Sequence, residues 1–259
     1  MSEAGHNSDA PAALARTLRA LTPARVALGR TGVSLPTRAL LDFQLSHAQA
    51  RDAVHARLEG AALAATLSQI TDSPVLRLHS AASDRATYLQ RPDLGRKLDE
   101  PSRELLKNQS GNQDGNLDSF DLALIVADGL SALAVERHVP PLLHELLPLL
   151  ADWRLAPITV VKQARVAIGD EIASILQAQI SVILIGERPG LSSPDSLGAY
   201  ITYGPHPGRT DAERNCISNI RAEGLGYPQA ATQLAFYLTE AHRRQLTGIA
   251  IKEEAHLLS

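Results

Sequence analysis

The sequence predicts an α/β fold: a mainly helical N-terminal region, residues 1–110, followed by a parallel-sheet domain, residues 111–259. Three observations predict it. Short apolar runs rich in β-branched residues follow residue 120, and segments with helical periodicity fill the intervals between them. A polar stretch, residues 107–116, separates this part from an alanine- and leucine-rich beginning. Apolar runs without alternation are typical of strands that are buried on both faces of a parallel sheet.

Leucine and alanine at helical spacing predict three helices in the N-terminal region. The first begins at Pro11 and ends at Pro23. The second begins at Pro36, since proline is favoured in the first turn of a helix, and the third spans residues 56–68. The second helix is expected to face a core with Leu40, Leu41, Leu45 and Ala48.

The second part of the chain reads as strands that alternate with helices. The expected strands are residues 122–127, 158–161, 180–185 and 199–203. Leucines from Leu142 onward predict a helix between the first two strands, which Pro148 should kink or shorten. Ile172 and its neighbours predict a second helix, and residues 228–244 a third. Right-handed crossovers would join the first three strands into a parallel sheet.

Composition excludes several classes of protein. The chain has 25 Lys and Arg against 28 Asp and Glu, a net charge of −3, so it offers no basic face for nucleic acid or an anionic membrane. Its single cysteine, Cys216, excludes an intramolecular disulfide and a thiolate zinc site. The sequence contains no apolar segment long enough to span a membrane and no secretory signal, so a cytoplasmic location is expected.

Ligands of open parallel sheets bind beyond the carboxyl ends of the strands. The segments that follow the first three strands are 128–131, 163–166 and 186–190, and they are polar or turn-forming. They predict a ligand site at this edge, although ordinary strand-to-helix turns would look the same. Asp128 and Ser131 are too close together for a catalytic triad, and we interpret them as a ligand contact and a helix cap.

Familiar catalytic and nucleotide signatures do not occur in this sequence. It contains no G-x-x-x-x-G-K-[ST] loop, no G-x-G-x-x-G after the first strand and no H-E-x-x-H pair. Cys216 could be a nucleophile, but a lone cysteine is more often a small apolar residue. A free-standing enzyme that acts on a phosphorylated metabolite is therefore disfavoured, because it would need a loop that binds phosphate.

Four segments resemble the family of small (light) subunits of ethanolamine ammonia-lyase. They are Thr-Tyr-Leu-Gln-Arg-Pro-Asp-Leu-Gly-Arg at 87–96, Asp-Gly-Leu-Ser at 128–131, Val-Ile-Leu-Ile-Gly-Glu-Arg-Pro-Gly-Leu at 182–191 and Arg-Asn-Cys-Ile-Ser-Asn-Ile at 214–220. The segments 36–43 and 47–54 are similar as well. The resemblance runs from about Arg25 to about Gly248. Several long motifs in the same order are more specific than one short pattern.

The resemblance implies a Rossmann-like cobalamin-binding domain, with adenosylcobalamin held between this chain and a larger, barrel-shaped subunit. Its reaction would convert ethanolamine to acetaldehyde and ammonia. The family's cofactor contacts fall on Val166, Glu187 and Cys216. We expect no catalytic residue and no metal ligand on this chain, because the cofactor and the large subunit would carry the reaction. The chain lacks D-x-H-x-x-G, so the cofactor is expected to stay base-on.

These residue types suit a corrin ring, which is wide and apolar and carries amide arms. Val166 offers apolar packing, Glu187 an acceptor for amide hydrogens, and Cys216 a small side chain that permits close approach. Ser46 departs from the family, which often has an acid there. The N-terminal lead is shorter than in relatives enclosed in bacterial microcompartments, which leaves encapsulation open. A non-enzymatic corrinoid-binding or carrier module is the alternative.

Overall fold

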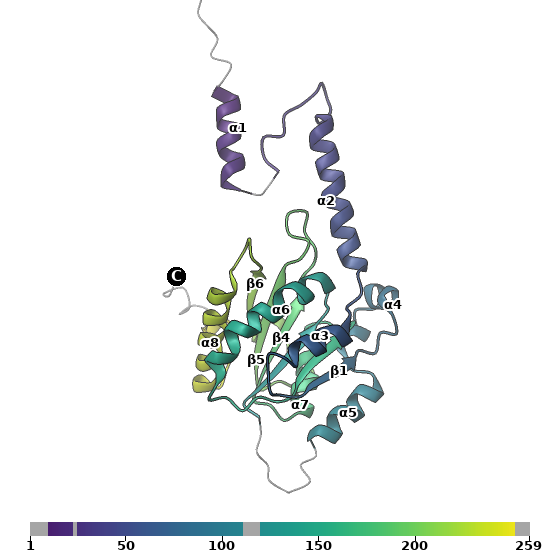
Figure 1. Ribbon diagram of the computed structural model, residues 1–259, viewed down its shortest axis with the longest axis vertical. Helices are drawn as coiled ribbons and strands as arrows, with labels where there is room; N and C mark the ends of the chain where they lie inside the picture. Colours follow the sequence, from purple (N-terminus) through teal and green to yellow (C-terminus); the bar gives the residue numbers. More distant parts are fainter. Residues whose placement is uncertain (1–9, 23–24, 111–119, 252–259) are drawn as a thin grey trace, which may run out of the picture.

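The computed structural model describes residues 10–22, 25–110 and 120–251, which form a mixed α/β structure on a six-stranded sheet (Figure 1). The strands lie in the order β1-β3-β2-β4-β5-β6. Their bounds are Val75–His79 for β1, Leu122–Ala127 for β2, Ile158–Lys162 for β3, Ile180–Gly186 for β4, Leu197–Tyr203 for β5 and Asn215–Ile220 for β6. The α/β class and the four expected strands are confirmed.

The expectation that the first three predicted strands are parallel is confirmed for β2, β3 and β4, but the sheet as a whole is mixed. Strands β1, β3, β2 and β4 are parallel to their neighbours, whereas β5 is antiparallel to β4 and β6 is antiparallel to β5. The connection from β4 to β5, residues 187–196, contains no helix. A parallel neighbour needs a crossover connection of about a dozen residues or more, usually a helix. The shorter connection here returns β5 in the opposite direction.

The sequence does not predict two of the strands, β1 and β6, and these form the two edges of the sheet. In β6, the buried side chains of Asn215 and Ile217 alternate with the exposed ones of Cys216 and Ser218. In β1, Arg77 is exposed in the middle of the strand. Edge strands with one exposed face contain no continuous apolar run, so the pattern that identifies the central strands does not identify them.

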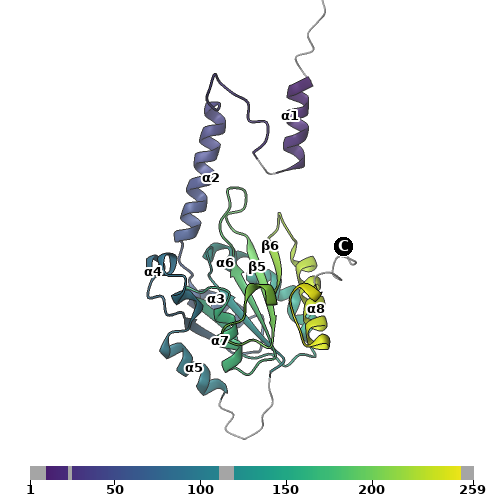
Figure 2. The ribbon, with the colours of Figure 1, turned by 180° about the vertical axis from the view of Figure 1, so that it is seen from behind.

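Helices cover both faces of the sheet (Figures 1 and 2). The larger core lies under α3 (Gly60–Leu67), α6 (Ala132–Leu146) and α8 (Tyr227–Arg244). The smaller core lies on the other face, under α5 (Glu100–Ser110) and α7 (Ile168–Ile175). Helices α6, α7 and α8 confirm the expected ones. As Pro148 predicts, α6 ends at Leu146 and the chain continues as a 3-10 turn, Leu147–Leu150.

The N-terminal arm, consisting of α1 (Ala10–Leu21) and α2 (Thr37–His55), projects beyond the carboxyl ends of the parallel strands (Figures 1 and 2). The expectation that α2 faces a core is wrong for this chain alone. Leu40, Leu41 and Leu45 are 41%, 57% and 59% exposed, and Ala48 is only half-buried. The reason is geometric, because α2 extends past the sheet and buries only Ala53 in its last turn.

Other N-terminal boundaries also differ from the prediction. The third helix begins at Gly60 instead of residue 56, and α5 continues to Ser110, so the stretch predicted as a loop from residue 107 starts as helix. Residues 111–116 of that stretch lie outside the described residues. Two further elements, α4 (Arg85–Gln90) and the 3-10 turn η1 (Leu94–Arg96), precede α5. Strand β1 precedes residue 110 in the sequence but belongs to the same sheet as the later strands. The division into two domains stays a prediction.

Candidate functional site

The carboxyl ends of β2, β3 and β4 lie at one edge of the sheet, as their parallel pairing requires. Beyond β2, the Asp128 carboxylate accepts hydrogen bonds from the backbone N–H groups of Gln163, at 2.9 Å, and Ala164, at 3.0 Å. Arg85 lies 3.5 Å from the same carboxylate. Burial raises the pKa of Asp128, while these backbone donors and Arg85 oppose the rise. With 1% exposure, Asp128 holds the strand ends together and leaves no surface for the expected ligand contact.

The turns after β2 and β4 are in direct contact. Gly129 has a φ of +54°, and a Cβ there would lie 2.2 Å from the carbonyl oxygen of Gly186, so only glycine fits. The N–H of Leu130 donates to that same oxygen at 2.9 Å. Ser131 then caps α6 by accepting a hydrogen bond from Ala134 N–H, which confirms the expected helix cap.

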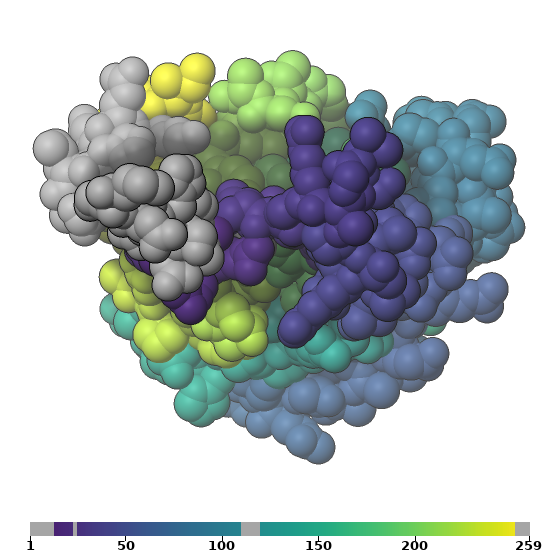
Figure 3. All heavy atoms as spheres, turned by 90° about the horizontal axis from the view of Figure 1, so that it is seen from above, coloured from purple at the N-terminus to yellow at the C-terminus, as the bar shows by residue number. Residues whose placement is uncertain are grey.

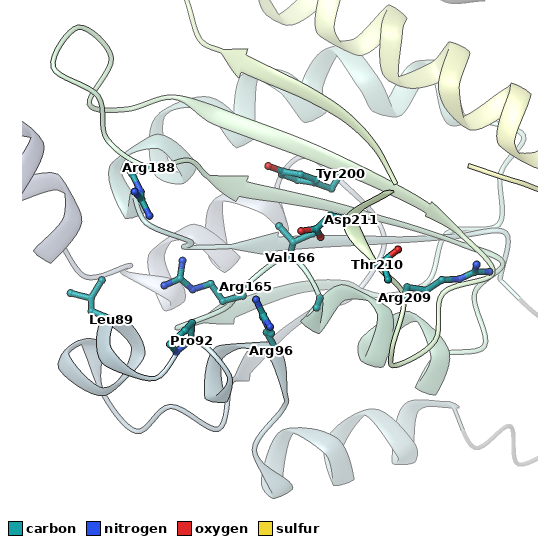
Figure 4. A pocket seen from close by; sticks show the side chains of 11 residues that line it. Leu89, Pro92, Arg96, Arg165, Val166, Arg188, Tyr200, Arg209, Thr210 and Asp211 are labelled. Carbon is teal, nitrogen blue, oxygen red and sulfur yellow. The ribbon is translucent and has the colours of Figure 1, made fainter. Parts of the chain in front are cut away.

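A cavity of about 700 Å³ lies beside this edge, on the face of the sheet that α7 covers (Figure 4). Its volume is within the range of ligand pockets. Four segments contribute to it: α4 with η1, the turn after β3, the loop after β4, and β5 with the loop that follows. The lining consists of Leu89, Pro92, Arg96, Arg165, Val166, Ala167, Arg188, Tyr200, Arg209, Thr210 and Asp211.

Val166 lines this cavity from the turn between β3 and α7. Gln163 begins that turn with a φ of +56°, which bends the chain sharply after β3. The Val166 carbonyl accepts a hydrogen bond from Gly169 N–H at 3.1 Å, so the residue is tied to the start of α7. Its side chain is half-buried against the smaller core. Val166 therefore presents an apolar group from a rigid turn.

Glu187 follows β4 directly, and its carboxylate is directed toward β5 and β6. Its Oε2 accepts hydrogen bonds from Ser196 Oγ and from Asn219 N–H, the latter at 3.3 Å. Gly198 leaves space for it, because a Cβ there would lie 2.9 Å from Glu187 Oε1. Within the described part of the chain, Oε1 accepts no hydrogen bond. Glu187 is thus a fixed carboxylate with one oxygen left to accept.

Cys216 lies on β6 directly opposite Tyr200 of β5. Because side chains alternate along a strand and Ile217 points into the larger core, Cys216 points to the cavity face. Its thiol is exposed, and its Sγ lies 3.2 Å from Ser218 Oγ. Burial raises the pKa of Tyr200, and Cys216 adds to the rise.

Tyr200 lies close to all three residues that are expected to bind a cofactor. It shares the cavity with Val166, it is the cross-strand partner of Cys216, and Glu187 is close enough to raise its pKa further. Of the three, only Val166 belongs to the cavity lining itself. Glu187 and Cys216 flank the cavity on the β4, β5 and β6 side.

Four cavity residues that the sequence does not single out are arginines: Arg96, Arg165, Arg188 and Arg209. They come from four segments of the chain: η1, the turn after β3, the loop after β4 and the loop after β5. A signal did exist, since Arg165 directly precedes Val166 and Arg188 directly follows Glu187. Neighbours of a predicted contact residue on the same turn are candidates for the same site.

Comparisons with known proteins agree with one another. The family model described as "Ethanolamine ammonia-lyase light chain (EutC)" matches residues 12–252. Proteins named ethanolamine ammonia-lyase small subunit are similar over most of the chain. One from Pseudomonas aeruginosa (strain LESB58) is 58% identical over 242 residues, 93% of this chain and 87% of the relative. One from Xanthomonas campestris pv. campestris (strain B100) is 58% identical over 240 residues, which are 92% of this chain and 87% of the relative.

Proposed function

The chain belongs to the family of ethanolamine ammonia-lyase light chains, and we propose that it forms, with a large subunit, the adenosylcobalamin site of that enzyme. The reaction of the assembled enzyme would be the conversion of ethanolamine to acetaldehyde and ammonia. The observation that carries the proposal is family membership together with a cavity beside the strand ends that Val166 lines.

The residues around the cavity fit a corrinoid. Val166, Leu89 and Pro92 offer apolar contacts for the ring. Glu187 Oε1 is an acceptor that is positioned but unused within the described residues, and the amide arms of a corrin are donors that suit it. Cys216 is a small exposed residue, so the ring can approach β6 closely. The chemistry of the donor set therefore supports this cofactor.

When bound, adenosylcobalamin would supply radical chemistry through its cobalt–carbon bond, and we propose that it binds in the base-on form. The residues of this chain bind and orient it: Val166 packs on the ring, Glu187 accepts from an amide arm, and Cys216 limits the distance to β6. Covering one face of the cofactor also excludes water. We assign no catalytic residue to this chain, because in this proposal the cofactor and the large subunit carry the reaction.

A protein partner is supported by the N-terminal arm. Its exposed apolar side chains include Leu14, Leu21, Leu41 and Leu45, with exposed fractions of 57% to 77%. Apolar groups gathered on one exposed element mark protein interaction sites. The arm projects from the edge of the sheet that carries the cavity (Figure 1), so a large subunit that covers the cavity would meet it. Figure 3 shows the molecule from that side.

The carrier-module alternative has less support, since the family that the chain belongs to is named for a lyase. Among the described residues, no helix combines the length and apolar character that crossing a membrane requires. A cytoplasmic location, inside or outside a microcompartment, stays a prediction from the sequence.

The test is a reconstitution with three samples: this chain, the large subunit, and the two together. Each is assayed for cobalamin binding by equilibrium dialysis and for acetaldehyde formation from ethanolamine. We expect binding and turnover only in the mixture. Turnover by the isolated chain would contradict the division of labour, and cobalamin binding by the isolated chain without any effect of the large subunit would favour the carrier module.

A further inference from the structure

Three arginines at the cavity have no counter-ion in the part of the chain that the structure describes. Arg96 on η1, Arg165 after β3 and Arg188 after β4 make no side-chain hydrogen bond or ion pair there. Figure 4 shows Arg165 between Arg188, from the loop after β4, and Arg96, from η1. Arg209 differs, because it is paired with Glu213 and its side chain runs away along the loop (Figure 4). The three form what we call the arginine cluster.

Arg165 is held in place although it lacks a counter-ion. Its guanidinium lies over the ring of Tyr88, 4.4 Å from the centroid. Its backbone N–H donates to Gly95 at 2.7 Å, and a Cβ on Gly95 would come within 3.0 Å of Arg165 Cγ. Its Nε is buried and has no partner within the described residues. A guanidinium fixed in this way loses little conformational freedom when an anion binds.

The charge around the cavity is unbalanced. Its lining contains four arginines and one acid, Asp211, in a chain whose net charge is −3. Asp211 does not neutralise the cluster, because its carboxylate lies 3.5 Å from the Nε of Arg214. Like charges that gather at one cavity repel one another, and an anion bound between them removes that repulsion.

We infer that Arg96, Arg165 and Arg188 form an anion subsite for the phosphodiester in the nucleotide arm of cobalamin; this inference rests on the proposed function. Guanidinium groups match the geometry of phosphate oxygens and bind them by charge-assisted hydrogen bonds. The corrin ring packs on Val166 of the same cavity, and the arm that hangs from the ring carries its phosphate to the cluster. The subsite gives the chain a way to recognise the complete cofactor and to reject corrinoids without a nucleotide.

The test compares two corrinoids on the assembled two-subunit enzyme. Cyanocobalamin carries the phosphodiester, whereas dicyanocobinamide has the corrin ring but lacks the nucleotide and its phosphate. Arg188→Gln and Arg165→Gln should each weaken cyanocobalamin binding by at least about tenfold in equilibrium dialysis, and leave dicyanocobinamide binding unchanged. Arg188 is exposed on a loop, so its substitution does not threaten the fold. Arg77→Gln is the charge-matched control outside the cavity lining, and it should change neither affinity.

The outcomes separate the subsite from the proposed function. If the arginine variants weaken both corrinoids equally, or neither, the subsite is overturned while the cofactor site stands. If the wild-type enzyme binds neither corrinoid, the proposed function fails and the inference fails with it. Inorganic phosphate is the third probe, and it should compete with cyanocobalamin but not with dicyanocobinamide. Arginine-dependent phosphate binding beside bound cyanocobalamin would assign the cluster to a free phosphate and overturn the inference.

Discussion

Tyr200 on β5 and Cys216 on β6 are directly opposite each other, on the face of the sheet that forms the cavity wall. The pKa of Tyr200 is raised, mainly by burial and next by the neighbouring thiol of Cys216. This wall therefore carries a neutral phenol at neutral pH. A neutral, partly apolar surface is suited to one face of a corrin ring, whereas charge is concentrated in the arginine cluster.

Tyr200 should lose its proton at higher pH in the folded subunit than in the unfolded chain. Because its folded-state pKa is raised, the folded state keeps a proton that the unfolded chain releases as the pH passes about 10. The contribution of Tyr200 to stability is complete below about pH 10 and is lost as the pH rises toward the folded-state pKa. Tyrosinate absorbance of the wild type and Tyr200→Phe, with and without urea, measures this. If the tyrosinate absorbance that Tyr200→Phe removes titrates at the same pH in the folded and the urea-unfolded protein, the expected rise in the pKa of Tyr200 is contradicted.

Substitutions of Cys216 should show whether cobalamin binding depends on the size of this side chain or on its thiol group. Cys216 is exposed, so neither Cys216→Ser nor Cys216→Phe removes packing from the core. Serine keeps the small volume, and cobalamin affinity of the assembled enzyme should stay close to wild type. Phenylalanine fills the approach to β6 and should abolish measurable binding in equilibrium dialysis. Equal affinities of the phenylalanine variant and the wild type would show that the ring does not approach Cys216.

Glu187→Gln should weaken cobalamin binding in the assembled enzyme. The carboxylate oxygen Oε1 is free to accept a charge-assisted hydrogen bond from an amide arm, which is worth about 1.5–3 kcal/mol, or roughly tenfold or more in affinity. The assembly of this variant with the large subunit, measured by sedimentation, should be unchanged.

Ser196→Ala is the matched control for Glu187, because Ser196 Oγ donates to Glu187 Oε2 and only ties the loop to β5. If Glu187 acted solely by holding this loop, Ser196→Ala would weaken cobalamin binding as much as Glu187→Gln does. A loss confined to Glu187→Gln supports direct contact with the cofactor.

The buried pair of Arg214 and Asp170 should control stability. Their side chains are 2% and 1% exposed, and the two terminal nitrogens of Arg214 donate to the carboxylate at 2.7 and 2.6 Å. Arg214→Met leaves the aspartate charge buried without a partner, at an expected cost of about 3–5 kcal/mol in the free energy of unfolding. Urea unfolding measures it. Adding Asp170→Leu should restore most of the loss, and a double variant as unstable as the single one would contradict this explanation.

The central strands could be predicted from the sequence because burial on both faces leaves continuous apolar runs, as at 122–127 and 180–185. Their order along the chain was enough to place Val166 and Glu187 beyond strand ends. The direction of β5 could not be predicted from the run at 199–203, because direction depends on the length of the connection before it.

The cavity was less predictable than the strand ends. Arg96 and Tyr88 belong to short elements before β2, and only tertiary packing brings them to the turn after β3. The exposed face of α2 marks a second limit. Leu41 and Leu45 have the spacing of a buried stripe, yet the chain supplies no core beside them. Periodicity identifies an apolar face, but it does not say whether that face packs on its own chain or on another.

The double substitution Leu41→Ser and Leu45→Ser decides between those two possibilities. Both leucines are more than half exposed, at 57% and 59%, so the free energy of unfolding of the isolated chain should change by no more than about 0.5 kcal/mol. Association with the large subunit should weaken, because the apolar surface that the arm offers is lost. Leu142→Ala is the contrasting control: Leu142 is 0% exposed, and its truncation should cost about 2–5 kcal/mol. Urea unfolding and sedimentation of the mixed subunits measure the two effects. A double variant that unfolds early but still assembles would mean that the arm packs on its own chain in solution.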